Sequence, residues 1–258
     1  MNYLPIEHVK NMEGLRIVAC VGAPSPWSLA ARALFDHKGV DYTLGAQIIA
    51  NDNTELKQWT GQNSAPVVAF RTSTEQEKIA TTAEAIVLLA ERIQPTPALI
   101  PSNQQQRAWM FGLLQALAGE DGFAWNRRLM SLSLAGGSNL TGNIRTMALK
   151  YDYSEEAAQR AAGRCASILR LFSETLLTQE KQHRPFLVGE QLTALDLYFT
   201  IFIGIMYQPL ADDRFPIPEM MRAGYEVKNA TLDQAADEIL FTHRDRVLER
   251  YLTPIMEY

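Results

Sequence analysis

Apolar and polar positions divide the chain into two parts of different character. Up to about residue 94, short apolar runs typical of buried strands alternate with helical patterns. Residues 15–21 and 65–70 predict strands, residues 40–49 predict a further extended segment, and a short strand around Ile79 would complete a hairpin. Helical spacing covers residues 26–38, 51–60 and 81–93. The first part therefore predicts the order β-α-β-α-β-β-α.

The second part reads as helix almost throughout. Three prolines (Pro95, Pro97 and Pro101) mark residues 95–103 as a linker. Beyond it, helical spacing covers residues 104–118, 154–177 and 231–251, the last in two pieces. Residues 135–139 interrupt the pattern, and three prolines predict irregular structure in residues 208–224. We expect an all-helical domain over residues 104–258.

Two helix starts carry a capping signal. Thr81 with Glu84 predicts a capping box, in which each side chain bonds the other residue's backbone N–H. Thr193 with Asp196 predicts a second box, flanked by a hydrophobic staple of neighbouring leucines. Ser154 is a further candidate cap. These signals indicate helix nucleation and structural stability.

Composition narrows the classes of function. The 258 residues carry a net charge of −5 and an isoelectric point near 5.5, with no basic stripe for nucleic acid. No apolar run reaches the ~18 residues of a membrane span, and the N-terminus lacks the apolar core of a secretion signal. The four histidines show no metal-ligand spacing, so we expect no metal. The only cysteines, Cys20 and Cys165, suit buried free thiols and a cytoplasmic location.

The strongest candidate for chemistry is the run Ser25, Pro26, Trp27 and Ser28, which follows the first predicted strand and opens a helix. Pro26 suits the first helical position and Ser25 suits the cap. The unpaired N–H groups and partial positive charge of a helix N-terminus stabilise an anion such as a thiolate. Cys20 falls inside the strand, too early to take part.

Five motifs in register resemble the glutathione transferase superfamily over about residues 15–208. They are Ser25-Pro26 at the first helix, Ala65-Pro66 at a strand start, the helix start in residues 81–92, the proline-bearing linker, and the run Phe186 to Gly189 with Thr193 to Asp196. The resemblance implies an α/β thioredoxin-like N-terminal domain in residues 1–94, with residues 1–14 as an extension. An all-α helical-bundle C-terminal domain would follow the linker.

The resemblance also implies chemistry. Glutathione would be the co-substrate, a small electrophile its acceptor, and detoxification the setting. Ser25 would donate to the glutathione thiolate, with Ser28 as the second catalytic candidate. Glutathione would contact Trp27, Ala65, cis Pro66, Thr82 and Ala83, although Trp27 could equally pack between the two halves.

The resemblance also implies a pocket for the electrophile between the two halves. Candidates to line it are Trp109, Phe111, Phe123 and Trp125, and for each of them core packing is the other interpretation. A homodimer is implied as well.

One departure from the family leaves alternatives open. The family usually has Glu-Ser where this chain has Thr82-Ala83, and Ala83 offers no side-chain hydrogen bond. A non-catalytic protein of the same fold, which carries ligands or mediates contacts, is therefore the alternative. Thiol–disulfide exchange would need a cysteine at position 25 or 28, where the sequence has serine. The sequence does not identify the electrophile.

Overall fold

The structure, a computed structural model, describes residues 2–49, 51–211, 213–226 and 228–252. Its first part contains a four-stranded sheet of β1 (Gly14–Cys20), β2 (Thr43–Gln47), β3 (Val67–Thr72) and β4 (Glu75–Ala80), in the order β2-β1-β3-β4. β1 and β2 are parallel, whereas β1 with β3 and β3 with β4 are antiparallel. The predicted order of strands and helices from residue 15 onward is confirmed.

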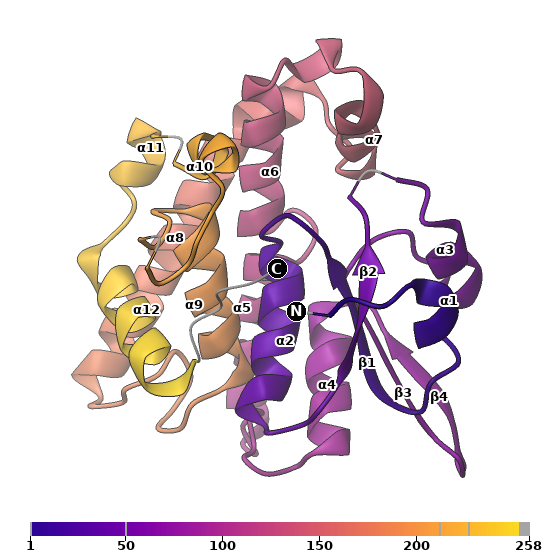
Figure 1. The fold of residues 1–258 in the computed structure, drawn as a ribbon. Helices are drawn as coiled ribbons and strands as arrows, with labels where there is room; N and C mark the ends of the chain where they lie inside the picture. The colour runs from indigo at the N-terminus through magenta and orange to yellow at the C-terminus, as the bar shows by residue number, and fades with distance from the viewer. Residues whose placement is uncertain (1, 50, 212, 227, 253–258) are drawn as a thin grey trace.

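Helices cover both faces of this sheet (Figure 1). α2 (Pro26–His37) and α4 (Ala83–Ile93) lie on one face, and α1 (Ile6–Val9) and α3 (Thr54–Thr60) lie on the other. Successive side chains of a strand point to opposite faces, so β1 serves both layers. Ile17 joins the main core on the α2 side, while Val18 joins a smaller cluster with Ile6 and Leu56. This is a thioredoxin-like arrangement.

The N-terminal extension is part of the folded layer, a feature the sequence did not predict. Leu4 forms a parallel bridge to Gly45 of β2, and α1 buries Ile6 and Val9 against the sheet. A Cβ atom at Gly45 would lie 3.2–3.4 Å from side-chain atoms of Val18, Ile6 and Val9. The glycine therefore makes room for α1 in the middle of a strand.

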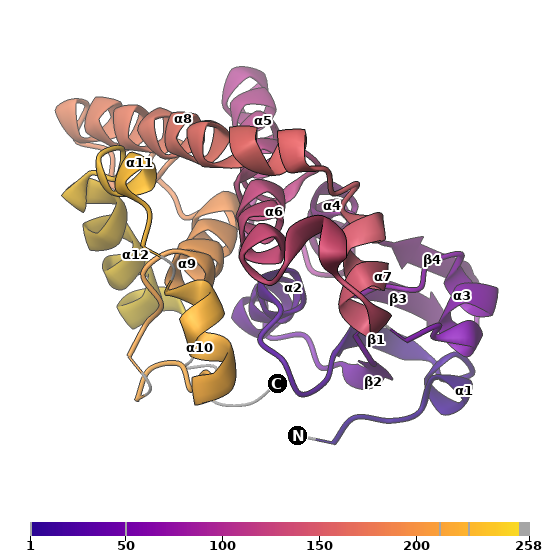
Figure 2. The same ribbon diagram turned by 90° about the horizontal axis from the view of Figure 1, so that it is seen from above.

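The second part is helical, as predicted. The core continues from the α2 face of the sheet into this bundle, at whose centre α9 is buried along its whole length and packs against α2, α5 and α12 (Figure 2). Among the described residues, the helices are α5 (Gln104–Ala118), α6 (Phe123–Leu134), the 3-10 helix η1 (Gly137–Asn139), α7 (Gly142–Lys150), α8 (Glu155–Lys181), α9 (Ala194–Met206), α10 (Glu219–Tyr225), α11 (Ala230–Asp233) and α12 (Glu238–Tyr251). None of them is both long and apolar enough to cross a membrane.

Three element predictions need correction. The segment 208–224 was expected to be irregular but contains most of α10, which starts directly after Pro218. The helix expected to end at residue 177 continues to Lys181. Thr82, and not Thr81, caps α4, because its Oγ1 accepts a hydrogen bond from the Ala85 N–H at 3.2 Å.

The capping box at α9 is confirmed. Asp196 Oδ2 accepts from the N–H and the hydroxyl of Thr193, at 2.8 and 2.6 Å. Its other oxygen, Oδ1, accepts from the Leu187 N–H at 2.9 Å and lies 3.0 Å from Nε2 of His243 on α12. The box therefore ties three segments of the bundle together.

Candidate functional site

One edge of the sheet gathers the residues that the sequence singled out. β1 ends there and leads through a short loop into α2. Because Val18 pairs with Val67, the antiparallel β3 begins at the same edge, directly after Pro66. The last residue of β4, Ala80, lies beside Val68 of β3, so α4 also starts there. Two helix N-termini therefore face the same edge, each with unpaired N–H groups and partial positive charge.

Ser25 occupies the capping position of α2. It is half-buried, and its Oγ accepts a hydrogen bond from the Ser28 N–H at 3.4 Å, while Pro26 fills the first helical position. A serine oxygen has two lone pairs and one proton. While it caps the helix, the hydroxyl can still donate its proton to an anion.

Two neighbours of Ser25 have structural tasks. Ser28 is only 2% exposed, and its Oγ accepts a hydrogen bond from the Cys20 N–H at 3.2 Å. This bond ties α2 to the end of β1 and gives Ser28 a structural task. Trp27 donates its indole N–H to the Ala118 carbonyl at 2.8 Å and packs edge-on against Phe202, with ring centroids 5.2 Å apart. Trp27 therefore packs between the two parts of the fold.

The other predicted glutathione contacts lie at the same edge. The Ala65-Pro66 peptide bond is cis, as the resemblance implied. Ala65 is half-buried and Pro66 is buried. Thr82 is exposed at the start of α4, and Ala83 is half-buried beside it. The structure thus brings Ser25, Ala65 and Thr82 to one edge of the sheet.

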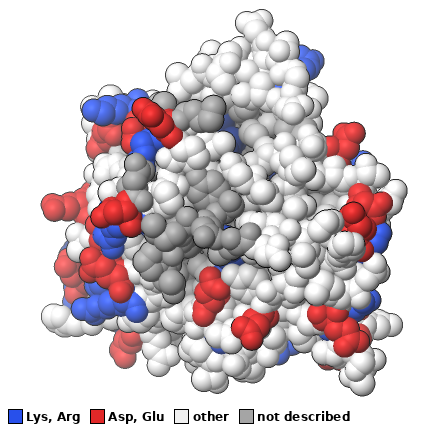
Figure 3. Space-filling view, viewed as in Figure 1, with Lys and Arg blue, Asp and Glu red and all other residues white. Residues whose placement is uncertain are grey.

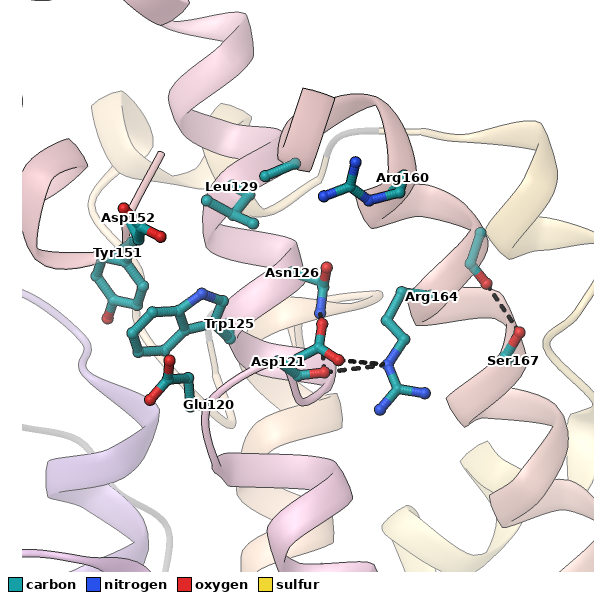
Figure 4. A pocket seen from close by; sticks show the side chains of 12 residues that line it. Glu120, Asp121, Trp125, Asn126, Leu129, Tyr151, Asp152, Arg160, Arg164 and Ser167 are labelled. Carbon is teal, nitrogen blue, oxygen red and sulfur yellow. Dashed lines mark hydrogen bonds and ion pairs between the residues drawn. The ribbon is translucent and has the colours of Figure 1, made fainter. Parts of the chain in front are cut away.

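Of the four residues expected to line an electrophile pocket, only Trp125 lines the pocket of about 420 Å³ shown in Figure 4. This pocket lies between α6 and α8, and the ring of Trp125 stands 4.7 Å from that of Tyr151. Phe123 is fully buried in the core, Trp109 is 47% exposed, and Phe111 is half-buried under the guanidinium of Arg107. Core packing is therefore the correct interpretation of Phe123.

Sequence reasoning missed a group of residues around the end of β1. Cys20 is only 8% exposed, and its Sγ lies 3.1 Å from Oε1 of Gln47. Burial raises the pKa of the Cys20 thiol, while Ser28, Ser25, Lys150 and Arg128 act in the opposite direction. The two cations come from α7 and α6, far along the chain. The one available signal was the pair Arg127-Arg128 within a helical segment of apolar spacing.

Tyrosines connect this group to the Ser25 loop. The Tyr225 hydroxyl donates to the Pro24 carbonyl at 3.0 Å, so α10 is fastened to the loop before Ser25. Arg128 interacts with the hydroxyls of Tyr225 and Tyr151. In the described part of the chain, no group of three His, Cys, Asp or Glu side chains is placed to hold a metal ion.

Comparison with known proteins identifies the fold. No protein-family model and no curated protein sequence matches the chain. A solved glutathione transferase from Pseudomonas putida, with one glutathione disulfide bound per subunit, superposes with a TM-score of 0.62 at 15% identity, over 93% of this chain and 89% of that one. A family member from Pseudomonas fluorescens, with two glutathione bound, gives 0.61 at 14% identity, over 92% and 89%.

A protein described as a nitrogen regulator shares the same architecture. The nitrogen regulation fragment of the yeast prion protein Ure2p superposes with a TM-score of 0.60 at 11% identity, over 97% of this chain and 96% of that fragment. The fold alone therefore does not fix an activity. The chain has the fold of the glutathione transferase superfamily.

Proposed function

We propose that this protein is a glutathione transferase in which Ser25 stabilises the glutathione thiolate. The observation that carries the proposal is the position of Ser25. Its hydroxyl caps α2 through the oxygen and keeps its proton available at the edge where β1 ends. A sulfur placed there would receive the Ser25 hydrogen bond and the positive end of the α2 dipole together.

The magnitudes are adequate for this chemistry. A free thiol has a pKa of about 8.5, and lowering it by about 2 units requires about 2.7 kcal/mol. A hydrogen bond to a charged group contributes about 1.5–3 kcal/mol, and a helix N-terminus adds about 0.3–1 kcal/mol. One hydroxyl and one helix end could therefore keep most of the bound thiol ionised at neutral pH. The thiolate would attack the electrophilic carbon and form a carbon–sulfur bond. In a substitution the leaving group departs with the electron pair of the broken bond, and in an addition the π electron pair moves to the neighbouring atom, which takes a proton from water.

The rest of the tripeptide would lie along the same edge. The backbone of Ala65, before the cis bond, is half-buried beside the end of β1 and would align the peptide. Thr82 and the free N–H groups at the start of α4 would receive the γ-glutamyl carboxylate. Ala83 adds no side-chain hydrogen bond, so recognition at this end would rely on Thr82 and the backbone.

An apolar electrophile would be received between α7 and the ends of β1 and β2. Figures 1 and 2 both show α7 next to these strand ends. Large apolar side chains are exposed on both sides, among them Val21, Ile48, Ile144 and Leu149. Figure 3 shows the charged residues mainly toward the margins of this face. A small substrate beside Ser25 would therefore find apolar side chains to contact.

The second candidate is a non-catalytic protein that binds glutathione or another ligand in the same place. Ala83 favours it, because one expected side-chain contact to glutathione is missing. The Ure2p fragment shows that a nitrogen regulation protein can have this fold. In that case glutathione would bind without conjugation to any electrophile.

We also propose a homodimer in the cytoplasm. Ile79, Leu88 and Trp109 are exposed on β4, α4 and α5, and α4 contacts both other elements, so a second copy could cover these side chains. Both cysteines are free and buried, which suits a reducing compartment.

The enzymatic proposal is tested by conjugation of glutathione to 1-chloro-2,4-dinitrobenzene. Ser25→Ala should reduce kcat/KM by about tenfold or more, because a hydrogen bond to a charged group is worth about 1.5–3 kcal/mol. Ser154→Ala is the matched control, since Ser154 caps α8 through a bond from the Ala157 N–H at 3.1 Å and lies elsewhere in the fold. Equal activity in both variants would remove Ser25 from the mechanism, and glutathione binding without any turnover would favour the second candidate.

A further inference from the structure

Two cationic side chains converge on the loop that leads from β1 to Ser25. Arg128, on α6, is half-buried and interacts with the hydroxyls of Tyr151 and Tyr225. Lys150, the last residue of α7, places its Nζ 5.6 Å from the centroid of the Tyr151 ring. Both cations act on the thiol of Cys20, where β1 ends. Two helices, α6 and α7, therefore bring two positive charges to the proposed sulfur position.

Neither cation has an acidic partner among the described residues. Two buried cations elsewhere in the fold do: Arg16 pairs with Glu77 at 2.9 Å and Lys38 with Glu91 at 2.6 Å. The Nε atom of Arg128 is buried without a hydrogen-bond partner in the described part of the chain. Removal of a charge from water is unfavourable unless an opposite charge or hydrogen bonds replace the water. An anion between these two side chains would therefore be stabilised.

Cys20, on which both cations act, does not supply that anion. Burial raises the pKa of the Cys20 thiol, so Cys20 stays neutral at neutral pH. The remaining partners of Arg128 are tyrosine hydroxyls, and burial raises the pKa of Tyr151, which keeps it neutral too. Since none of the described residues supplies the negative charge, we assign it to a ligand.

We propose that Arg128 and Lys150 form an anion subsite that selects electrophiles with a carboxylate, sulfonate or phosphate attached to an apolar body. The inference rests on the proposed function, because the subsite adjoins the position assigned there to sulfur. The apolar body would contact exposed side chains such as Val21 and Leu149. Two cations from different helices give a preference for negative charge that apolar surface alone does not provide.

A matched pair of fluorescent probes tests the subsite without glutathione. One is 8-anilinonaphthalene-1-sulfonate, and the other is N-phenyl-1-naphthylamine, which has the same rings but no sulfonate. Arg128→Gln and Lys150→Gln should each weaken binding of the sulfonate about tenfold, while binding of the neutral probe changes less than about twofold. The affinity of the sulfonate should also fall as salt is added.

Arg145→Gln is the control, because Arg145 is an exposed arginine on the same helix, α7. It should leave both affinities unchanged. Lys150 is exposed, so Lys150→Gln gives a folded variant even if Arg128→Gln disturbs packing. Unchanged sulfonate affinity in Lys150→Gln, or an equal loss for both probes, would overturn the subsite.

Two further outcomes separate the subsite from the proposed function. If the variants leave sulfonate binding unchanged but raise the pKa of the thiol of bound glutathione, the two cations stabilise the thiolate. The proposed selectivity for anionic electrophiles is then wrong. If the wild-type protein binds the sulfonate selectively but does not bind glutathione, the subsite stands and the proposed function fails.

Discussion

At the scale of single residues, the sequence predicted the structural role of a side chain where that side chain bonds the backbone of nearby residues in the chain. Ser25 and Pro26 could be assigned to the start of α2 because capping depends on neighbours in the chain. The hydrogen bond between Ser28 and Cys20 could not be predicted, since it joins two different elements. The choice between Thr81 and Thr82 was equally hidden, because adjacent threonines offer the same hydroxyl and only backbone geometry selects one.

A buried thiol gives a prediction on alkaline stability. Burial raises the pKa of Cys165 to about 12, whereas an unfolded thiol titrates near 8.5. Between these values the unfolded chain binds fewer protons than the folded one, so the free energy of unfolding falls as pH rises, by up to about 1.4 kcal/mol per pH unit. The contribution is fully present below about pH 8.5.

The measurement is urea unfolding at pH 8 and pH 10, in the wild type and in Cys165→Ala. From the onset near pH 8.5 to pH 10, the wild type should lose about 2 kcal/mol more than the variant. Other groups that titrate in this range act in both proteins and cancel in the comparison. An equal loss would show that Cys165 titrates normally in the folded protein.

At the scale of elements, helix boundaries followed from caps and strands from apolar runs. The long helix α8 begins after Ser154 as expected, and α5 matches its predicted span. α10 was missed because the prolines before it suggested irregular chain, although Pro218 sits directly at its start. The capping box of α9 was visible in Thr193 and Asp196, but its contact with α12 was not.

The Asp196 network predicts an element-scale effect on stability. Asp196→Ala would leave the N–H groups of Thr193 and Leu187 and the ring of His243 without their buried acceptor. We expect the free energy of unfolding to fall by about 3–5 kcal/mol, because each buried donor left without an acceptor costs about 1–3 kcal/mol. Asp237→Ala removes an exposed cap of α12 and should lose only about 1 kcal/mol. If chemical unfolding gave similar losses of unfolding free energy for both variants, the proposed contribution of the Asp196 network would be wrong.

At the scale of the whole molecule, the fold class could be inferred but the convergence of distant residues could not. The order of strands and helices and the proline-marked linker lie along the sequence. Arg128, Lys150 and Tyr225 meet at the Ser25 loop only because α6, α7 and α10 fold over the sheet edge. No spacing rule relates such positions in the sequence, so the contacts of these three residues could be found only in the structure.

The proposed dimer is testable at the same scale. Light scattering should give a mass near twice the chain mass of 28.9 kDa. Trp109→Glu should shift the mass toward the monomer, because a charge would replace an exposed apolar side chain on α5. Leu177→Glu, on the exposed surface of α8, is the control. A monomer in the wild type would refute the proposal.

The central claim is that a sulfur anion is stabilised beside Ser25 at the start of α2. Its most direct test is the thiolate absorbance near 240 nm of protein saturated with glutathione, followed against pH. We predict a midpoint about 2 units below the 8.5 of free thiols, and a return toward 8.5 in Ser25→Ala. A midpoint near 8.5 in the wild type, or no binding at millimolar glutathione, would contradict the account.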